Sequence, residues 1–148
     1  MISAKSNIGV HLPNLLLIAG NGRNVGKTWF ACRIIEQLSK TTEICGVKIS
    51  SHYHPFNEAD VLFKNEHFIL LEEKQITSKD SSLMLQAGAK LVYFIMTDKK
   101  HLPEAFEYIQ NYLPEHAIVC ESGGLHEIAT PGSVSYTHLT LPTMLAQC

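Results

Sequence analysis

The apolar residues of this chain fall into short continuous runs that alternate with segments of helical spacing. Residues 15–19 form an apolar run between Pro13 and Gly20, which is typical of a strand buried on both faces of a parallel sheet. In residues 27–40, Phe30, Ile34, Ile35 and Leu38 recur at helical spacing and predict an amphipathic helix. The first part of the chain therefore predicts a strand, a glycine-rich loop and a helix in succession.

The same alternation continues along the chain. Further strands are predicted for residues 43–50, 67–73, 90–97 and 116–120, and residues 52–60 are expected to form a loop. One short helix should follow the capping residues at 78–82 and end at Gly88, and another should begin near Pro103 with an apolar face that reaches Leu113. Strands that alternate with helices predict an α/β fold with a mostly parallel sheet.

Composition and charge narrow the class of protein. The 148 residues suit one domain, and 12 lysines and arginines against 14 acids give a net charge of −2 with no basic run for nucleic acid. None of the four cysteines forms a C-x-x-C pair, and Cys32, Cys45 and Cys120 lie in apolar stretches that indicate core positions. Because the first apolar run is too short for a signal peptide or a membrane span, we expect a cytoplasmic protein with no membrane partner.

The C-terminal segment resembles a translated sequencing adapter. Residues 134–143 read VSYTHLTLPT, which is the translation of GTC TCT TAT ACA CAT CTG ACG CTG CCG ACG. A natural threonine-rich strand is the alternative. We expect a nucleotide-binding domain over residues 1–133 that is incomplete at its C-terminus, and residues 134–148 that are not native, so His138 and Cys148 are not site candidates.

The glycine-rich segment 20–28, GNGRNVGKT, has the character of a phosphate-binding P-loop. Successive backbone N–H groups and the start of the following helix attract phosphate, the Lys27 ammonium bridges the β- and γ-phosphates, and the Thr28 hydroxyl ligates Mg²⁺. Asn21 stands where the standard motif has its first glycine, which asparagine tolerates because it adopts a left-handed backbone more readily than most residues. A tight turn that binds nothing is the alternative. The predicted nucleotide-binding residues are Gly22, Arg23, Asn24, Val25, Gly26, Lys27 and Thr28.

A carboxylate that supports the Mg²⁺ is expected at the end of a nearby strand. Glu121 follows an apolar strand and precedes Gly123 and Gly124, so we predict that it acts with Lys27 in catalysis and with Thr28 at the metal. A surface glutamate at a strand end is the alternative for Glu121.

Four further polar residues are candidates for contact with a substrate or for a switch. Lys48 ends the second strand and either faces the cleft or is solvated, and Asp80 either caps a helix or reaches a ligand. His52 and His54 are expected near a polar substrate, because a zinc site built from them with Cys45 or His67 lacks a recognisable ligand spacing.

Four segments together resemble the SIMIBI class of P-loop proteins, and most closely the MobB family. They are GRNVGKT at 22–28, GVKISSHYH at 46–54, KDSSLMLQAGA at 79–89 and VCESG at 119–123. The family shows a loop ending G-K-T, a strand ending I-K-H-x-H, a K-D-S-x-x-x-x-x-A-G-A helix and a strand ending V-E-G. The loop length and the continuation ESGGL at 121–125 are also similar to dethiobiotin synthetase, an ATP-dependent ligase.

The resemblance implies a three-layer P-loop NTPase sandwich that binds GTP or ATP with Mg²⁺ and hydrolyses it slowly. A MobB-like protein would be an accessory to molybdopterin cofactor biosynthesis, with a protein of that pathway as its partner, and the resemblance leaves a homodimer open. No N-K-x-D base-reading motif is recognisable. The alternatives are an ATP-dependent ligase of the dethiobiotin synthetase type, a small-molecule kinase, or a non-catalytic nucleotide-gated binding module.

Overall fold

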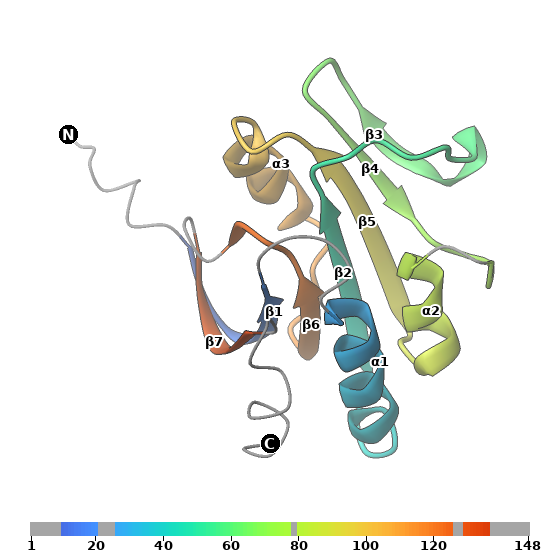
Figure 1. Ribbon diagram of the computed structural model, residues 1–148, viewed down its shortest axis with the longest axis vertical. Helices are drawn as coiled ribbons and strands as arrows, with labels where there is room; N and C mark the ends of the chain where they lie inside the picture. The colour runs from blue at the N-terminus through green and yellow to red at the C-terminus, as the bar shows by residue number, and fades with distance from the viewer. Residues whose placement is uncertain (1–9, 21–25, 78–79, 126–128, 137–148) are drawn as a thin grey trace.

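The protein folds around one seven-stranded sheet (Figure 1). The computed structural model describes residues 10–20, 26–77, 80–125 and 129–136. The strand order is β3-β4-β5-β2-β6-β1-β7. Adjacent strands from β5 to β7 are parallel, whereas β4 is antiparallel to both β3 and β5. The predicted α/β fold with a mostly parallel sheet is therefore confirmed.

The elements follow one another along the chain with short connections. The strands are β1 Val10–Ala19, β2 Ile44–Ser50, β3 Val61–Lys64, β4 Phe68–Glu72, β5 Leu91–Thr97, β6 Ala117–Glu121 and β7 Ala129–Tyr136. The helices are α1 Lys27–Leu38, α2 Asp80–Ala87 and α3 Leu102–Ile109, with a 3₁₀ turn η2 at Glu58–Asp60.

Most predicted elements occur within two or three residues of their expected positions, and the following features differ from the predictions. β1 begins at Val10 rather than at Leu15, because residues 10–12 pair with β7. The segment 52–60, expected as a loop, contains η2, and the edge strand β3, which is four residues long, was not predicted. The helix that starts at Leu102 ends at Ile109 rather than near Leu113, because the Asn111 and Tyr112 N–H groups bond to carbonyls three residues back and tighten the chain into a turn.

Apolar side chains alternate between the two faces of the sheet and build a core on each. Leu17, Val47, Ile95 and Cys120 point to the face covered by α3, where Phe106 packs. On the opposite face α1 and α2 pack on a second cluster, which contains Ile18, Phe30, Ile35, Ile44, Met84, Val92 and Val119. The sheet therefore lies between two helical layers (Figure 1).

The glycine within β2 has a packing role. A Cβ atom at Gly46 would lie 2.9 Å from the Met84 Sδ and 3.4 Å from a methyl group of Val92. Because a Cβ atom does not fit at that distance, glycine allows α2 to approach the sheet closely. This explains a residue that is otherwise unfavourable in a strand.

The last strand crosses the boundary that the sequence suggested. β7 runs parallel to β1, with Leu17 opposite Val134 and Ala19 opposite Tyr136, so its backbone continues beyond Ser133. The pairing of β7 does not test whether the residues after Ser133 are native, so their origin from a sequencing adapter stays a prediction. Among the residues that the structure describes, none of the helices combines the length and apolar character needed to cross a membrane.

Candidate functional site

Parallel pairing brings several strand ends together at one edge of the sheet. The register places Glu121 of β6 opposite Ile18 of β1 on one side and opposite Lys48 of β2 on the other. β5 lies next to β2 and ends at Thr97, so its carboxyl end reaches the same edge. Ligand sites of open α/β sheets lie at this edge, and the predicted polar residues gather there.

Glu121 joins Thr28 and Lys48 into one polar cluster. One carboxylate oxygen, Oε1, accepts a hydrogen bond from the Thr28 hydroxyl at 2.8 Å, and the other lies 3.0 Å from the Lys48 ammonium. The Glu121 side chain is only 4% exposed and that of Lys48 is 16% exposed. Because a buried charge needs compensation, the ion pair explains how both residues are accommodated there.

The turn into α1 lies beside this polar cluster. Gly26 has a φ of 88°, a left-handed conformation that favours glycine, and its carbonyl accepts the Phe30 N–H at 3.0 Å. The Lys27 ammonium donates to the Gly20 carbonyl at 3.3 Å. The predicted binding residues Gly22, Arg23, Asn24 and Val25 lie outside the described residues.

Burial lowers the pKa of Lys27 below its usual 10.5. Desolvation is the largest cause; the nearby Glu121 carboxylate opposes it, and Lys48 adds to it through like-charge repulsion. Desolvation and the repulsion from Lys48 both disfavour the charged form of Lys27, and an anion placed beside Lys27 would offset them. The cluster therefore favours a negatively charged ligand near Lys27.

A cavity of about 1180 Å³ opens on this cluster. The end where the sequence predicts phosphate binding, called the phosphate end below, is lined by Gly20, Gly26, Lys27, Thr28, Lys48, Glu121, Ser122, Gly123 and Gly124. The volume of the cavity exceeds the upper end of the roughly 300–1,000 Å³ that small-molecule sites usually occupy. The cavity thus has the volume for one large ligand or for two smaller ones.

The loop after β2 lines the opposite end of the cavity. His52 and His54 are both exposed there, and the Ser50 hydroxyl donates to the His52 carbonyl at 3.0 Å and lies 3.3 Å from the His54 Nε2. The alternative of a zinc site with Cys45 or His67 gains no support: Cys45 is buried in the core, and the His67 Nδ1 lies 2.8 Å from Glu104. In the described part of the chain, no three His, Cys, Asp or Glu side chains gather as a metal site.

The sequence predictions for Cys32 and Asp80 have different outcomes. Cys32, which was expected in the core, is half-buried: it packs against the core cluster beneath α1 and also lines the cavity. Asp80 opens α2 as expected of a residue near a helix start, but its side chain is outside the described part of the chain, so capping and ligand binding both stay predictions.

Sequence reasoning did not identify Asp98, Lys99 and Leu102, which line the cavity after β5. The signal that could have found Asp98 is the one that found Lys48, namely a charged residue at the carboxyl end of a buried parallel strand. The Asp98 Oδ1 accepts the His101 backbone N–H at 2.8 Å and lies 2.8 Å from the His101 Nδ1. These contacts lower the Asp98 pKa, mainly through the backbone hydrogen bond.

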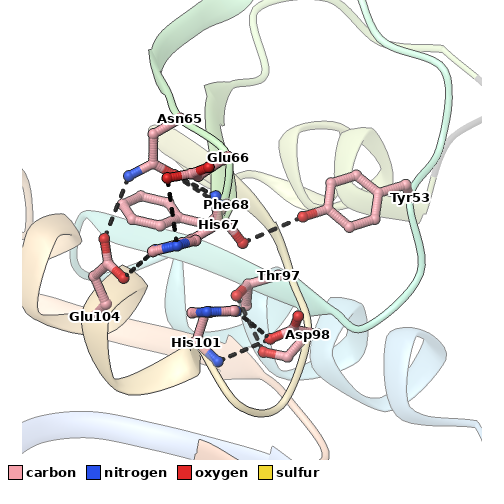
Figure 2. A network of polar contacts seen from close by, with 9 residues as sticks. All are labelled: Tyr53, Asn65, Glu66, His67, Phe68, Thr97, Asp98, His101 and Glu104. Atoms are coloured by element: carbon pink, nitrogen blue, oxygen red, sulfur yellow. Dashed lines mark hydrogen bonds and ion pairs between the residues drawn. The ribbon is translucent and has the colours of Figure 1, made fainter.

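Figure 2 shows that Asp98 belongs to a larger surface network. The His101 ring stacks on the His67 ring with centroids 4.0 Å apart, and the His67 Nδ1 lies 2.8 Å from a Glu104 oxygen. The Tyr53 hydroxyl donates to the His67 carbonyl at 3.3 Å. The network therefore connects both loops at this end of the cavity to the β3–β4 turn.

The oxygen donors at the phosphate end suit Mg²⁺. This ion prefers hard oxygen ligands and is usually held by one or two carboxylates together with substrate phosphates and water. The Thr28 hydroxyl and the Glu121 carboxylate are in direct contact and provide two such oxygen ligands beside the start of α1. The residues present therefore fit the ion.

Comparison of the chain with protein-family models, with curated proteins and with solved structures gives no match. The resemblance to MobB and dethiobiotin synthetase therefore rests on the four quoted segments, and the function must be argued from the site itself.

Proposed function

We propose that the protein binds a nucleoside triphosphate with Mg²⁺ and hydrolyses it slowly, on a P-loop sandwich fold. The observation that carries the proposal is the contact of one buried carboxylate, Glu121, with both Thr28 and Lys48 beside the start of α1. A threonine at a helix start beside a strand-end carboxylate is the arrangement that holds the Mg²⁺ of a triphosphate.

The triphosphate would be anchored by backbone and by charge. The left-handed Gly26 and the first N–H groups of α1 provide partial positive charge. The Lys27 ammonium adds a full positive charge, and a bound phosphate would raise the lowered pKa of this group. Lys48 pairs with one oxygen of the Glu121 carboxylate, while the other oxygen faces Thr28. Bound Mg²⁺ would supply charge neutralisation at the phosphate oxygens. The residues of this site would bind the triphosphate and stabilise charge. In the absence of a partner protein, the expected turnover is therefore slow.

The resemblance supports a MobB-like accessory role in molybdopterin cofactor biosynthesis, with GTP as the expected nucleotide and a protein of that pathway as partner. The segments at 46–54 and 79–89 support it, since they border the cavity from β2 and α2.

A second candidate is an ATP-dependent ligase or small-molecule kinase. The size of the cavity favours it, because the end lined by Ser50, His52 and His54 has room for a second, polar substrate. In a third alternative, a non-catalytic module, the triphosphate would only order a loop.

Phosphate release from GTP and from ATP with Mg²⁺ separates these functions, measured with and without small carboxylates and alcohols. The accessory role predicts slow GTP turnover that no small molecule stimulates. ATP turnover that depends on a carboxylate or an alcohol would contradict it and support the ligase or kinase. Tight binding with no turnover would support the module.

A further inference from the structure

The only tryptophan of the chain stands at the cavity, directly after the predicted Mg²⁺ ligand. Trp29 is 55% exposed although it belongs to the first turn of α1, and it lines the cavity. Tryptophan is usually well buried, so an open indole beside a ligand cavity requires an explanation. We propose that Trp29 is a stacking platform for the nucleobase of the bound triphosphate.

The neighbouring turn of α1 orients the indole. The Arg33 guanidinium lies over the ring at 5.8 Å from its centroid, and Arg33 is itself 3.4 Å from the Glu36 carboxylate. A guanidinium over an aromatic ring is a favourable contact that limits how the ring can turn. Since the indole remains more than half exposed and lines the cavity, the surface that Arg33 does not cover is available to a ligand.

The cavity extends from Trp29 along a slot between α1 and α2. Cys32 and Glu36 line this slot from α1, and Leu83, Gln86 and Ala87 line it from α2. Leucine, alanine and the indole present apolar surface to a planar ring, while the Gln86 amide offers one donor and one acceptor to its edge. Residues 26–29 and the slot line the same cavity, so a ligand whose phosphates lie at residues 26–28 would have the indole within reach of its nucleoside.

The inference deepens the proposed function and rests on it, since the phosphates must be held at the start of α1. Stacking of a base on an aromatic side chain does not depend on the identity of the base, because every base has a π face. Loss of one such contact by alanine substitution lowers affinity about 10- to 100-fold. The platform therefore contributes affinity for a nucleoside but none for its phosphates.

The experiment compares nucleoside triphosphate with inorganic tripolyphosphate, which has the phosphates but no base. Calorimetry would give the affinity of the full chain for Mg-GTP, Mg-ATP and Mg-tripolyphosphate. For Trp29→Ala we expect about tenfold or greater loss for either nucleotide and an unchanged affinity for tripolyphosphate. Trp29→Phe should retain most of the nucleotide affinity, and nucleotide but not tripolyphosphate should quench the indole fluorescence.

Ile76→Ala is the matched control, because Ile76 is 61% exposed and is not among the described residues that line the cavity. This control should leave all three affinities unchanged. If Trp29→Ala keeps the ratio of nucleotide to tripolyphosphate affinity of the parent chain, the platform is refuted while triphosphate binding stands. If the parent chain binds neither nucleotide nor tripolyphosphate, the proposed function and the platform both fail.

Discussion

The two ends of the cavity are built in different ways. At the phosphate end the Glu121 side chain, 4% exposed, is fixed by hydrogen bonds to Thr28 and Lys48. At the far end the Asp98 side chain is 57% exposed, and its contacts are with His101, three residues away. One end is built on a buried ion pair between two strands of the sheet, and the other on exposed contacts between surface loops.

The difference indicates how each end can change. Removing one member of a buried ion pair leaves the charge of its partner uncompensated, so the phosphate end tolerates few substitutions. Exposed ion pairs contribute little, so the loops that carry Asp98, His52 and His54 can vary without loss of the fold. In the proposed function, the buried end would hold the phosphates and the exposed end would contact a partner or a second substrate.

The largest effect on stability is expected for Glu121→Ala. The substitution leaves the Lys48 ammonium, which is 16% exposed, without its carboxylate and removes the acceptor of the Thr28 hydroxyl. The loss should be about 3 kcal/mol in the free energy of unfolding, measured by urea denaturation.

Glu66→Ala is the control for this comparison, because the Glu66 side chain is 88% exposed and its contact with His67 is 3.9 Å long. It should leave the urea midpoint nearly unchanged. Equal losses in the two variants would show that the phosphate end is no more fixed than the surface. The double change Lys48→Met with Glu121→Leu should recover part of the loss, since it leaves no charge unpaired.

A smaller effect is expected in the proton balance of ligand binding. Lys27 has a lowered pKa in the folded chain, so it destabilises the fold below that pKa, and stability rises with pH from there toward the ordinary 10.5. Bound triphosphate would raise this pKa, so binding at a pH between the lowered pKa and 10.5 should take up a fraction of a proton. Calorimetry in buffers of different ionisation enthalpy measures this uptake.

In Lys27→Arg the side chain stays charged throughout this range, so the uptake should disappear while binding is retained. Binding heats of the parent chain that do not depend on the buffer would contradict the assignment of Lys27 to the phosphate.

The smallest effect is expected for Asp98→Asn. The carboxylate accepts the His101 N–H and its pKa is lowered, so its contribution to stability is present above the ordinary pKa of 3.8 and is lost as pH falls through the lowered value. The urea midpoint at neutral pH should fall far less than for Glu121→Ala, and the difference from the parent chain should shrink in acid. A loss as large as that of Glu121→Ala would show that the far end is equally fixed.

The sequence predicted the parts of the site that local patterns determine. The apolar run before Gly20, the helical spacing after Lys27 and the acid after the strand at 116–120 all point to the carboxyl edge of a parallel sheet. These patterns led to Thr28, Lys48 and Glu121, which the structure brings into direct contact.

Other features depend on register and on tertiary packing, which local patterns do not contain. That Lys48 pairs with Glu121 follows from β2 and β6 being neighbours, although β3, β4 and β5 separate them in the chain. The strand β3 is too short for a periodic signal and is defined by its pairing with β4. Trp29 was not among the residues that the helical pattern singled out, and its place beside the cavity is a feature of the tertiary structure.

Calorimetric titration of Mg-GTP and Mg-ATP into the full chain and into Lys27→Ala tests the central claim most directly. The proposed site predicts saturable binding of at least one nucleotide by the parent chain, weakened about 30-fold or more in the variant because the charge that faces the phosphates is lost. Equal affinity of the two proteins, or no binding of either nucleotide by the parent chain, would contradict a triphosphate site at the start of α1.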